Sequence, residues 1–156
     1  MQMRPARPSE GRKLADMLVE WHPEMSSSYF RDHDDVDGWF VVEVEGEIVG
    51  FLEQGQFCRW EELAGYEHLT EDDVAPFIRW IFVLPEHRNR GAGSVLLNGW
   101  MDALERAGVA LVVVLPDKST DDEARIRFFE RHGFRWLTTN KDWLPPWLMG
   151  RPLPNR

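Results

Sequence analysis

A basic, glycine-spaced turn at residues 85–93, PEHRNRGAG, contains the residue types in this chain that best match a chemical task. It follows the apolar run FIRWIFVL and precedes SVLLNGWMDALERAG, so we expect a strand to pass into a helix there. The first N–H groups of a helix have no acceptor inside the helix and carry a partial positive charge. Glycines let an anion approach those groups, and Arg88 and Arg90 add charged donors. The spacing therefore predicts a phosphate-binding turn.

The turn differs from two better-known phosphate loops. The chain has no GxxxxGK[ST] sequence, which excludes a Walker A loop. It also has no GxGxxG, and the turn follows a middle strand, which disfavours a dinucleotide-binding fold. Taken alone, the pattern R-x-x-G-x-G is equally compatible with an ordinary connection between a strand and a helix.

Composition narrows the class of protein and the kinds of partner. The 156 residues are most simply one domain, and a net charge of −9 argues against a nucleic-acid partner. Cys58 is the only cysteine, and the five histidines have no metal-ligand spacing, so we expect no disulfide and no metal site. No apolar run is long enough to span a bilayer or to serve as a signal peptide. We therefore expect a cytoplasmic protein without a membrane partner.

The elements that must position the turn can be read from hydrophobic periodicity. The pattern predicts a strand at 2–6, a helix capped by Ser9, a hairpin of 39–45 and 47–54 joined at Glu45-Gly46, an irregular or partly helical insertion at 58–75, a strand at 76–84 that is buried on both faces, a helix at 93–107, a strand at 110–116, a helix at 121–131, and strands at 134–139 and 147–152. This order indicates a mixed α/β protein with one partly antiparallel sheet and helices packed on it.

Two motifs at their observed separation resemble the GNAT N-acetyltransferase superfamily. That family has a strand ending in V-x-P-x-x-R and an R/Q-x-x-G-x-G/A turn that opens a helix. Here VLPEHR at 83–88 leads into RNRGAG at 88–93. A second family pattern, similar to Tyr-Glu-Lys-x-Gly-Phe, is represented by FERHGF at 129–134. The resemblance therefore extends from the predicted turn to the third helix.

The N-terminal half is also similar to this family. RPARPSEGRKLADML at 4–18 looks like its first strand and helix, and WFVVEVEGEIVGF at 39–51 looks like its second and third strands. The resemblance implies one GNAT-like domain over 1–156 with the acyl-CoA N-acyltransferase fold. In that fold a mainly antiparallel central sheet of six to seven strands carries helices on both faces.

The resemblance implies acetyl-CoA as cosubstrate and assigns residues to it. By this similarity the pyrophosphate is surrounded by Arg88, Asn89, Arg90, Gly91, Ala92, Gly93 and Ser94, while main-chain groups of Phe82 and Val83 pair with the pantetheine arm. A backbone donor near the thioester is expected to polarise its carbonyl. Asp122 and Phe129 occupy the cofactor-side positions of the second motif. No metal is implied.

The second motif departs from the family pattern at the residue expected to act as general acid. Phe129 replaces a tyrosine that many relatives hold near the sulfur, Asp122 replaces a frequent asparagine, and Arg125 replaces an alanine. Three explanations remain open at this point. Another donor or water protonates the thiolate, the weakly basic thiolate leaves without a proton, or the protein binds CoA without catalysing transfer.

The general base is likewise not fixed by the resemblance. Some relatives carry a glutamate or histidine on the strand before the turn, where this chain has Phe77 and Arg79. Glu53, at the end of the third predicted strand, is the best remaining carboxylate, with Glu43 and Glu45 on the neighbouring strand. A solvated strand glutamate, or a base that acts through a chain of water molecules, is the alternative.

Two acidic runs and several aromatic residues lie where this family receives its acceptor. The runs at 32–37 and 61–73 favour a cationic amine, or else form a solvated surface. Trp60, Tyr66, Trp143 and Trp147 either line a pocket or belong to the core, and WLPPWLMG at 143–150 is apolar enough for a homodimer contact.

The function expected from these observations is acetyl-CoA-dependent N-acetylation of a primary amine on a small molecule or peptide. The amine attacks the thioester directly in a ternary complex. The alternative is a non-catalytic acyl-CoA-binding or sensing module, for which Phe129 is the motive. A third class, another nucleotide-binding α/β enzyme, is disfavoured by the spacing of the turn.

Overall fold

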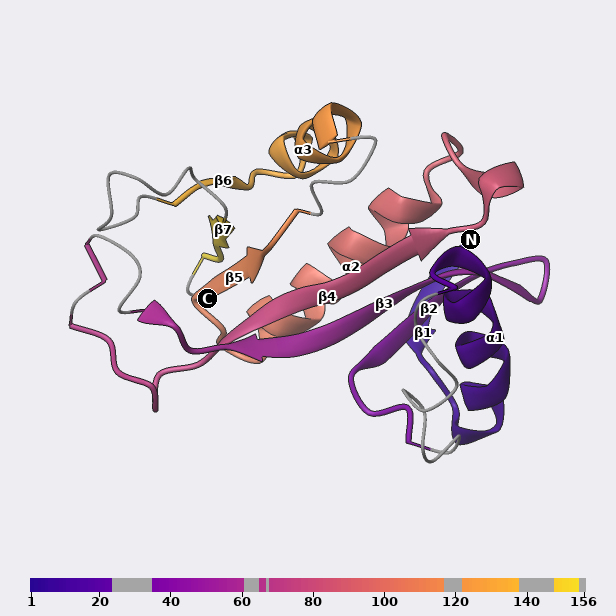
Figure 1. The fold of residues 1–156 in the computed structure, drawn as a ribbon, viewed down its shortest axis with the longest axis horizontal. Helices are drawn as coiled ribbons and strands as arrows, with labels where there is room; N and C mark the ends of the chain where they lie inside the picture. The colour runs from indigo at the N-terminus through magenta and orange to yellow at the C-terminus, as the bar shows by residue number, and fades with distance from the viewer. Residues whose placement is uncertain (24–34, 61–64, 67, 117–121, 138–147, 155–156) are drawn as a thin grey trace. The chain divides into compact units, whose positions relative to one another are not determined.

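The computed structural model describes residues 1–23, 35–60, 65–66, 68–116, 122–137 and 148–154, although the side chain of Asp122 is not among the described atoms (Figure 1). Within these ranges the elements are β1 (Gln2–Pro5), the 3-10 helix η1 (Pro8–Glu10), α1 (Gly11–Trp21), β2 (Trp39–Val44), β3 (Glu47–Phe57), β4 (Ala75–Val83), the 3-10 helix η4 (Pro85–His87), α2 (Ala92–Arg106), β5 (Leu111–Val114), α3 (Asp122–Arg131), β6 (Arg135–Trp136) and β7 (Met149–Pro152). The predicted order of strands and helices is confirmed. No helix in these ranges combines the length and the apolar character needed to cross a membrane.

The strands form one sheet in the order β1-β2-β3-β4-β5-β7-β6. Pairs β1–β2, β2–β3, β5–β7 and β6–β7 are antiparallel, and β4–β5 is parallel. The predicted fold class, a mainly antiparallel sheet with helices, is thereby confirmed.

The chain contacts divide it into two compact units. One consists of Met1–Glu53 with Ile81–Leu96, and the other of Gln54–Trp80 with Leu97–Arg156. The basic turn and the N-terminal hairpin belong to the first unit. The expectation of a single domain over 1–156 stays a prediction.

In the first unit, an ion cluster joins β1 to the start of α1. Arg4 Nη2 lies 2.6 Å from Oε1 of Glu10 and 2.5 Å from Oε1 of Glu43. The hydrogen bond from Arg4 holds the pKa of the Glu10 carboxyl below its usual range. The Glu10 carboxylate also accepts the amide of Arg7 at 2.7 Å. The predicted cap by Ser9 is wrong, because Ser9 lies inside η1. The residue before α1 is Glu10, which makes no side-chain cap to α1, and its carboxylate instead caps η1 through the Arg7 amide.

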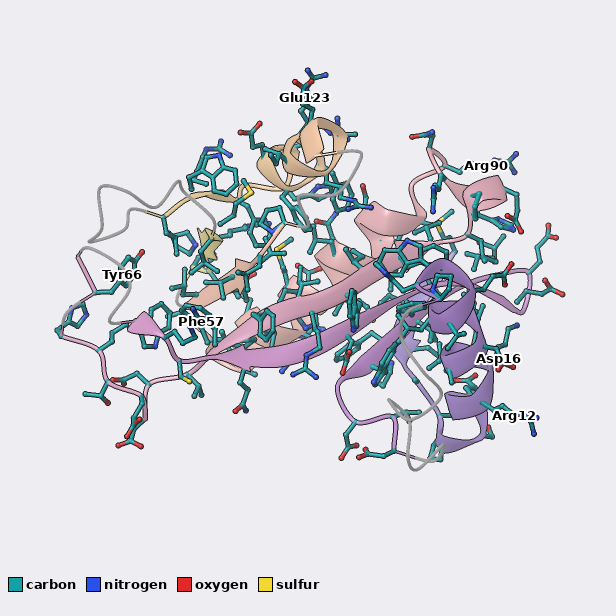
Figure 2. All side chains as sticks on the ribbon, in the orientation of Figure 1. Arg12, Asp16, Phe57, Tyr66, Arg90 and Glu123 are labelled. Carbon is teal, nitrogen blue, oxygen red and sulfur yellow. The ribbon has the colours of Figure 1, made fainter. Side chains whose placement is uncertain are left out.

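The hairpin of β2 and β3 turns at the predicted dipeptide. Glu45 has φ 53° and Gly46 has φ 82°, so both residues adopt the left-handed conformation that a two-residue hairpin turn requires. The predicted hairpin is confirmed, and β3 continues to Phe57, beyond the expected end at residue 54. In Figure 1, α1 runs alongside β1 and β2, and in Figure 2 Arg12 and Asp16 project from its outer face.

In the second unit, the segment after β3 contributes to a hydrophobic core. Phe57, Trp60, Ala75, Val113 and Leu148 form a buried cluster, with Tyr66 packed against it. Trp60 stacks on Tyr66 with ring centres 5.5 Å apart, and its Nε1 donates to the carbonyl of Asp73 at 2.5 Å. The alternative of a core role is confirmed for Trp60.

β4 connects both units and ends at the basic turn. Within β4 only Ala75, Ile78 and Phe82 are buried and Arg79 is exposed, so the expectation of burial on both faces is wrong. The register with β5 covers Phe77 and Ile78, opposite Val113 and Val114. β4 then continues to Val83, so its last residues extend beyond this paired stretch.

Candidate functional site

The turn between β4 and α2 presents a row of backbone amides. Asn89 has φ 59° and Gly91 has φ 89°, and these two left-handed residues turn the chain into the helix. The amide of Val95 donates to the carbonyl of Gly91 at 3.0 Å, which makes Gly91 the residue before the first helical turn. The N–H groups from Gly91 to Ser94 therefore have no acceptor within the helix. They form a row of donors at the turn for which the sequence predicts anion binding.

The space beside Gly91 is open. A Cβ atom built at this position meets no other atom within 4 Å. The left-handed φ, and not crowding, is therefore the local reason for glycine here. Ala92, by contrast, is buried and anchors the start of α2. An anion can therefore reach the amide row from the side of Gly91.

The two arginines of the turn point in different directions. Arg88 Nε donates to the carbonyl of Val83 at 2.9 Å, and its guanidinium carbon lies 5.5 Å from the centre of the Phe82 ring. Arg90 is exposed, and Figure 2 shows it projecting away from the turn. Arg88 therefore lies against the end of the strand, and Arg90 supplies positive charge in solvent.

The edge of β4 next to the turn carries main-chain groups that do not face β3. The amide of Leu84 donates to the carbonyl of Val49 in β3 at 2.8 Å. Because successive residues of a strand direct their N–H and C=O groups to opposite edges, those of Val83 face away from β3 and those of Phe82 face toward it. The amide of Val83 and the main-chain groups of Ile81 thus face the edge where a ligand could continue the sheet, while the Val83 carbonyl accepts Arg88 Nε and the Phe82 ring is buried.

An aromatic cluster covers one face of the first unit at the end of α1. Trp21 stacks on Phe82 with ring centres 4.7 Å apart, and Phe51 lies 5.5 Å from Phe82 and 5.3 Å from Trp39. Glu53 is opposite Trp39 in the register, so it lies on the same face as these rings. Its exposed fraction is 6%, and it is the buried charged residue of the described core. Glu53 is therefore not the solvated strand glutamate that the sequence left open as an alternative.

Trp21 is a residue that sequence reasoning missed. It continues the apolar stripe of Leu14, Met17 and Leu18 by one further turn of α1, and that spacing is the signal by which it is detectable. His22 follows it, with its ring centre 4.6 Å from that of Trp21. The end of α1 is thereby fixed against Phe82, the residue before Val83.

The residues predicted from the second motif belong to the other unit. Phe129 is buried, and its ring packs 5.3 Å from Phe128 and 5.5 Å from Phe134. Asp122 is the first residue of α3. Their predicted roles at the cofactor stay predictions, as do those of the turn residues.

Several predicted acceptor-side features fall outside the described residues. Trp143, Trp147 and residues 32–34 of the acidic run at 32–37 are among these, as are parts of the run at 61–73. Within the ranges that are described, no group of three histidine, cysteine, aspartate or glutamate side chains is arranged to hold a metal ion.

Comparison with known proteins places this geometry in a family. A sequence model described as "Acetyltransferase (GNAT) family" matches residues 8–134. An uncharacterized N-acetyltransferase of Methanocaldococcus jannaschii is 33% identical over 110 residues, which cover 70% of this chain and 44% of that protein. The chain spans less than half the length of the curated relatives it matches.

Solved structures share the fold at low sequence identity. Arabidopsis thaliana NAA60, in complex with a bisubstrate analogue, has a TM-score of 0.69 and 18% identity, with 99% of this chain and 98% of that chain covered. The PaiA N-acetyltransferase from Thermoplasma acidophilum, in complex with coenzyme A, has a TM-score of 0.63 and 11% identity, with 97% and 98% covered.

The sheet order and the amide row define an α/β protein in which a turn with a row of backbone N–H groups joins a central strand to a helix. With the match over residues 8–134, the chain belongs to the acetyltransferase (GNAT) family.

Proposed function

We propose that this protein is an acetyl-CoA-dependent N-acetyltransferase that acts on a primary amine of a small molecule or peptide. The observation that carries the proposal is the row of N–H groups from Gly91 to Ser94, which follows β4 and η4 and opens α2 in a chain of this family. Backbone donors at a helix N-terminus suit the pyrophosphate of the cosubstrate. Main-chain groups of Val83 and Ile81, on the edge of β4 away from β3, suit its pantetheine amides.

In the proposed reaction the neutral amine attacks the thioester carbonyl in a ternary complex. The C–N bond forms, the C–S bond breaks to release CoA as its thiolate, and the attacking nitrogen gives up a proton to the base or to water. A backbone N–H at the edge of β4 polarises the carbonyl oxygen. The ammonium form of the acceptor must first lose a proton, which requires a base within reach, either directly or through water.

Glu53 is the carboxylate we assign as this base. It is buried on the face that carries Trp21, Phe51 and Phe82, and Phe82 directly precedes Val83, whose amide lies on the edge proposed for the cosubstrate. Glu43 is a weaker candidate because its carboxylate is bound to Arg4. Glu45 lies exposed in the hairpin turn. Of these three glutamates, Glu53 alone combines burial with the aromatic face.

The second motif offers no proton donor for the leaving thiolate, because Phe129 stands where a tyrosine would act. The ring is packed in a core and bears no hydroxyl. We propose that the CoA thiolate leaves without a proton, because a thiolate is only weakly basic, and that water protonates it afterwards. A cationic acceptor is proposed from the acidic character of the chain, whose net charge is −9.

The experiment that tests the proposal measures thiol release from acetyl-CoA in the presence of a panel of primary amines. Thermal unfolding with and without CoA is followed in parallel. Turnover with at least one amine, together with a raised Tm, is expected. A raised Tm without turnover on any amine favours the non-catalytic CoA-binding module, and no rise in Tm contradicts both.

A further inference from the structure

Arg88 makes two contacts within the protein that binding to a phosphate would not require of it. Its Nε donates to the carbonyl of Val83 at 2.9 Å, and its guanidinium carbon lies 5.5 Å from the centre of the Phe82 ring. Both partners belong to the end of β4, five and six residues earlier in the chain. The side chain therefore spans η4 from the turn back to the strand.

The backbone conformation at Arg88 and Asn89 explains why this side-chain contact is needed to hold the turn. The amide of Arg88 donates to the carbonyl of Pro85 at 3.2 Å, which closes the 3-10 turn, and Arg88 itself is extended, with φ −69° and ψ 157°. The next residue, Asn89, has φ 59°, a left-handed conformation that a non-glycine residue adopts at a cost. A turn of this kind holds its geometry only when neighbouring contacts fix it.

The Phe82 ring is itself held in place by two other aromatic rings. Trp21 stacks on it with an interplanar angle of 27°, and Phe51 lies 5.5 Å away. The Phe82 ring is thus a fixed surface on which the planar guanidinium rests. The Nε–carbonyl bond and the ring contact together set the distance between the edge of β4 and the amide row.

We propose that Arg88 is a positioning residue that couples the pantetheine-binding edge of β4 to the pyrophosphate-binding amides, and that its essential group is the Nε–H donor and not the positive charge. The inference rests on the proposed function, since it assumes that both surfaces hold one CoA molecule. It differs from the expectation that Arg88 serves as a charged ligand of the phosphates.

Side-chain chemistry offers variants that separate the donor from the charge. Glutamine carries an amide nitrogen the same number of bonds from Cα as Nε of arginine, and it has no charge. Lysine keeps the charge but has a methylene group at that position. Methionine has neither the donor nor the charge. The three substitutions Arg88→Gln, Arg88→Lys and Arg88→Met therefore give opposite rankings for the two roles.

The experiment is a calorimetric titration of CoA into the wild-type chain and the three variants, with thermal unfolding as a check of folding. Loss of one hydrogen bond of about 1.4 kcal/mol corresponds to about a tenfold change in Kd. We expect Arg88→Gln to stay within about threefold of the wild type and Arg88→Met and Arg88→Lys to bind about tenfold more weakly.

The outcomes distinguish failure of the proposed function from failure of the positioning role of Arg88. A wild-type chain that does not bind CoA refutes the proposed function, and the inference with it. A wild-type chain that binds CoA, with Arg88→Lys binding at least as tightly as Arg88→Gln, overturns the positioning role alone and assigns Arg88 to the phosphates. Arg90→Gln serves as the comparison for loss of charge at an exposed position of the same turn.

Discussion

Gly91→Glu is the substitution that separates anion binding from folding most clearly. Gly91 has φ 89°, and a Cβ atom there meets nothing within 4 Å. Gly46, in the hairpin turn of β2 and β3, has φ 82° and equally open space. Gly46→Glu is therefore a matched control, with the same added charge and nearly the same backbone strain but a different position.

The expected magnitudes follow from geometry and charge. A left-handed non-glycine residue costs about 1–2 kcal/mol, which lowers Tm by a few degrees, about equally in both variants. Two unit charges about 4 Å apart in water repel by about 1 kcal/mol, so a glutamate beside two phosphate charges weakens CoA binding by about 2 kcal/mol, or about 30-fold.

The assay is a titration of CoA into the wild type and both variants, with Tm recorded for each. Both variants should unfold a few degrees below the wild type, and only Gly91→Glu should lose CoA affinity. Equal CoA affinity of the two variants would refute the assignment of the anion to the amides of this turn.

Three further predictions concern the base, the close approach of β3 to β4 at Gly50, and the ion cluster of Arg4, Glu10 and Glu43. Glu53→Gln should lower kcat by about 100-fold and flatten the acidic limb of the pH–rate profile, whereas Glu47→Gln, at an exposed position of the same strand, should leave both unchanged. Gly50→Ala should destabilise the fold by about 1–3 kcal/mol, measured by denaturant unfolding, because its Cβ would lie 2.6 Å from the carbonyl oxygen of Phe82. Glu10→Gln should lower stability at pH 7 by about 1 kcal/mol, and the difference from the wild type should disappear in acid.

The sign of the last effect follows from the pKa of the Glu10 carboxyl. Its hydrogen bond with Arg4 lowers that pKa in the folded chain, so its stabilising contribution is complete above the ordinary carboxyl pKa of about 4.3. The contribution is lost as the pH falls through the lower folded value. A difference in Tm that stays constant from neutral to acid pH would contradict this reasoning, as an unchanged pH profile for Glu53→Gln would contradict its role as base.

The elements that local sequence determines were predictable. Glu45-Gly46 adopts the two left-handed conformations that its residue types favour, and α2 begins and ends within one residue of its predicted bounds. The cap of η1 was not predictable from local pattern, because the Glu10 carboxylate that accepts the Arg7 amide is also bound by Arg4, which in turn holds Glu43. The Arg4–Glu43 contact joins residues 39 positions apart, so the local sequence does not show it.

Part of the candidate site was predictable from the sequence, and part was not. The glycine spacing located the amide row, because a helix N-terminus follows from a local pattern. The direction of Arg88 did not follow from that pattern, since it depends on the Val83 carbonyl and the ring of Phe82. Trp60 lies in a core that includes Val113 and Leu148, so its burial depends on residues far away in the sequence.

The most direct test of the central claim is a backbone amide NMR titration with CoA. Binding at the turn predicts that the amide signals of Gly91, Ala92, Gly93 and Ser94 shift most, together with that of Val83. Signals from the β2–β3 hairpin turn, at Glu45 and Gly46, should stay in place. Saturable CoA binding that leaves the Gly91–Ser94 amides unshifted would contradict the account.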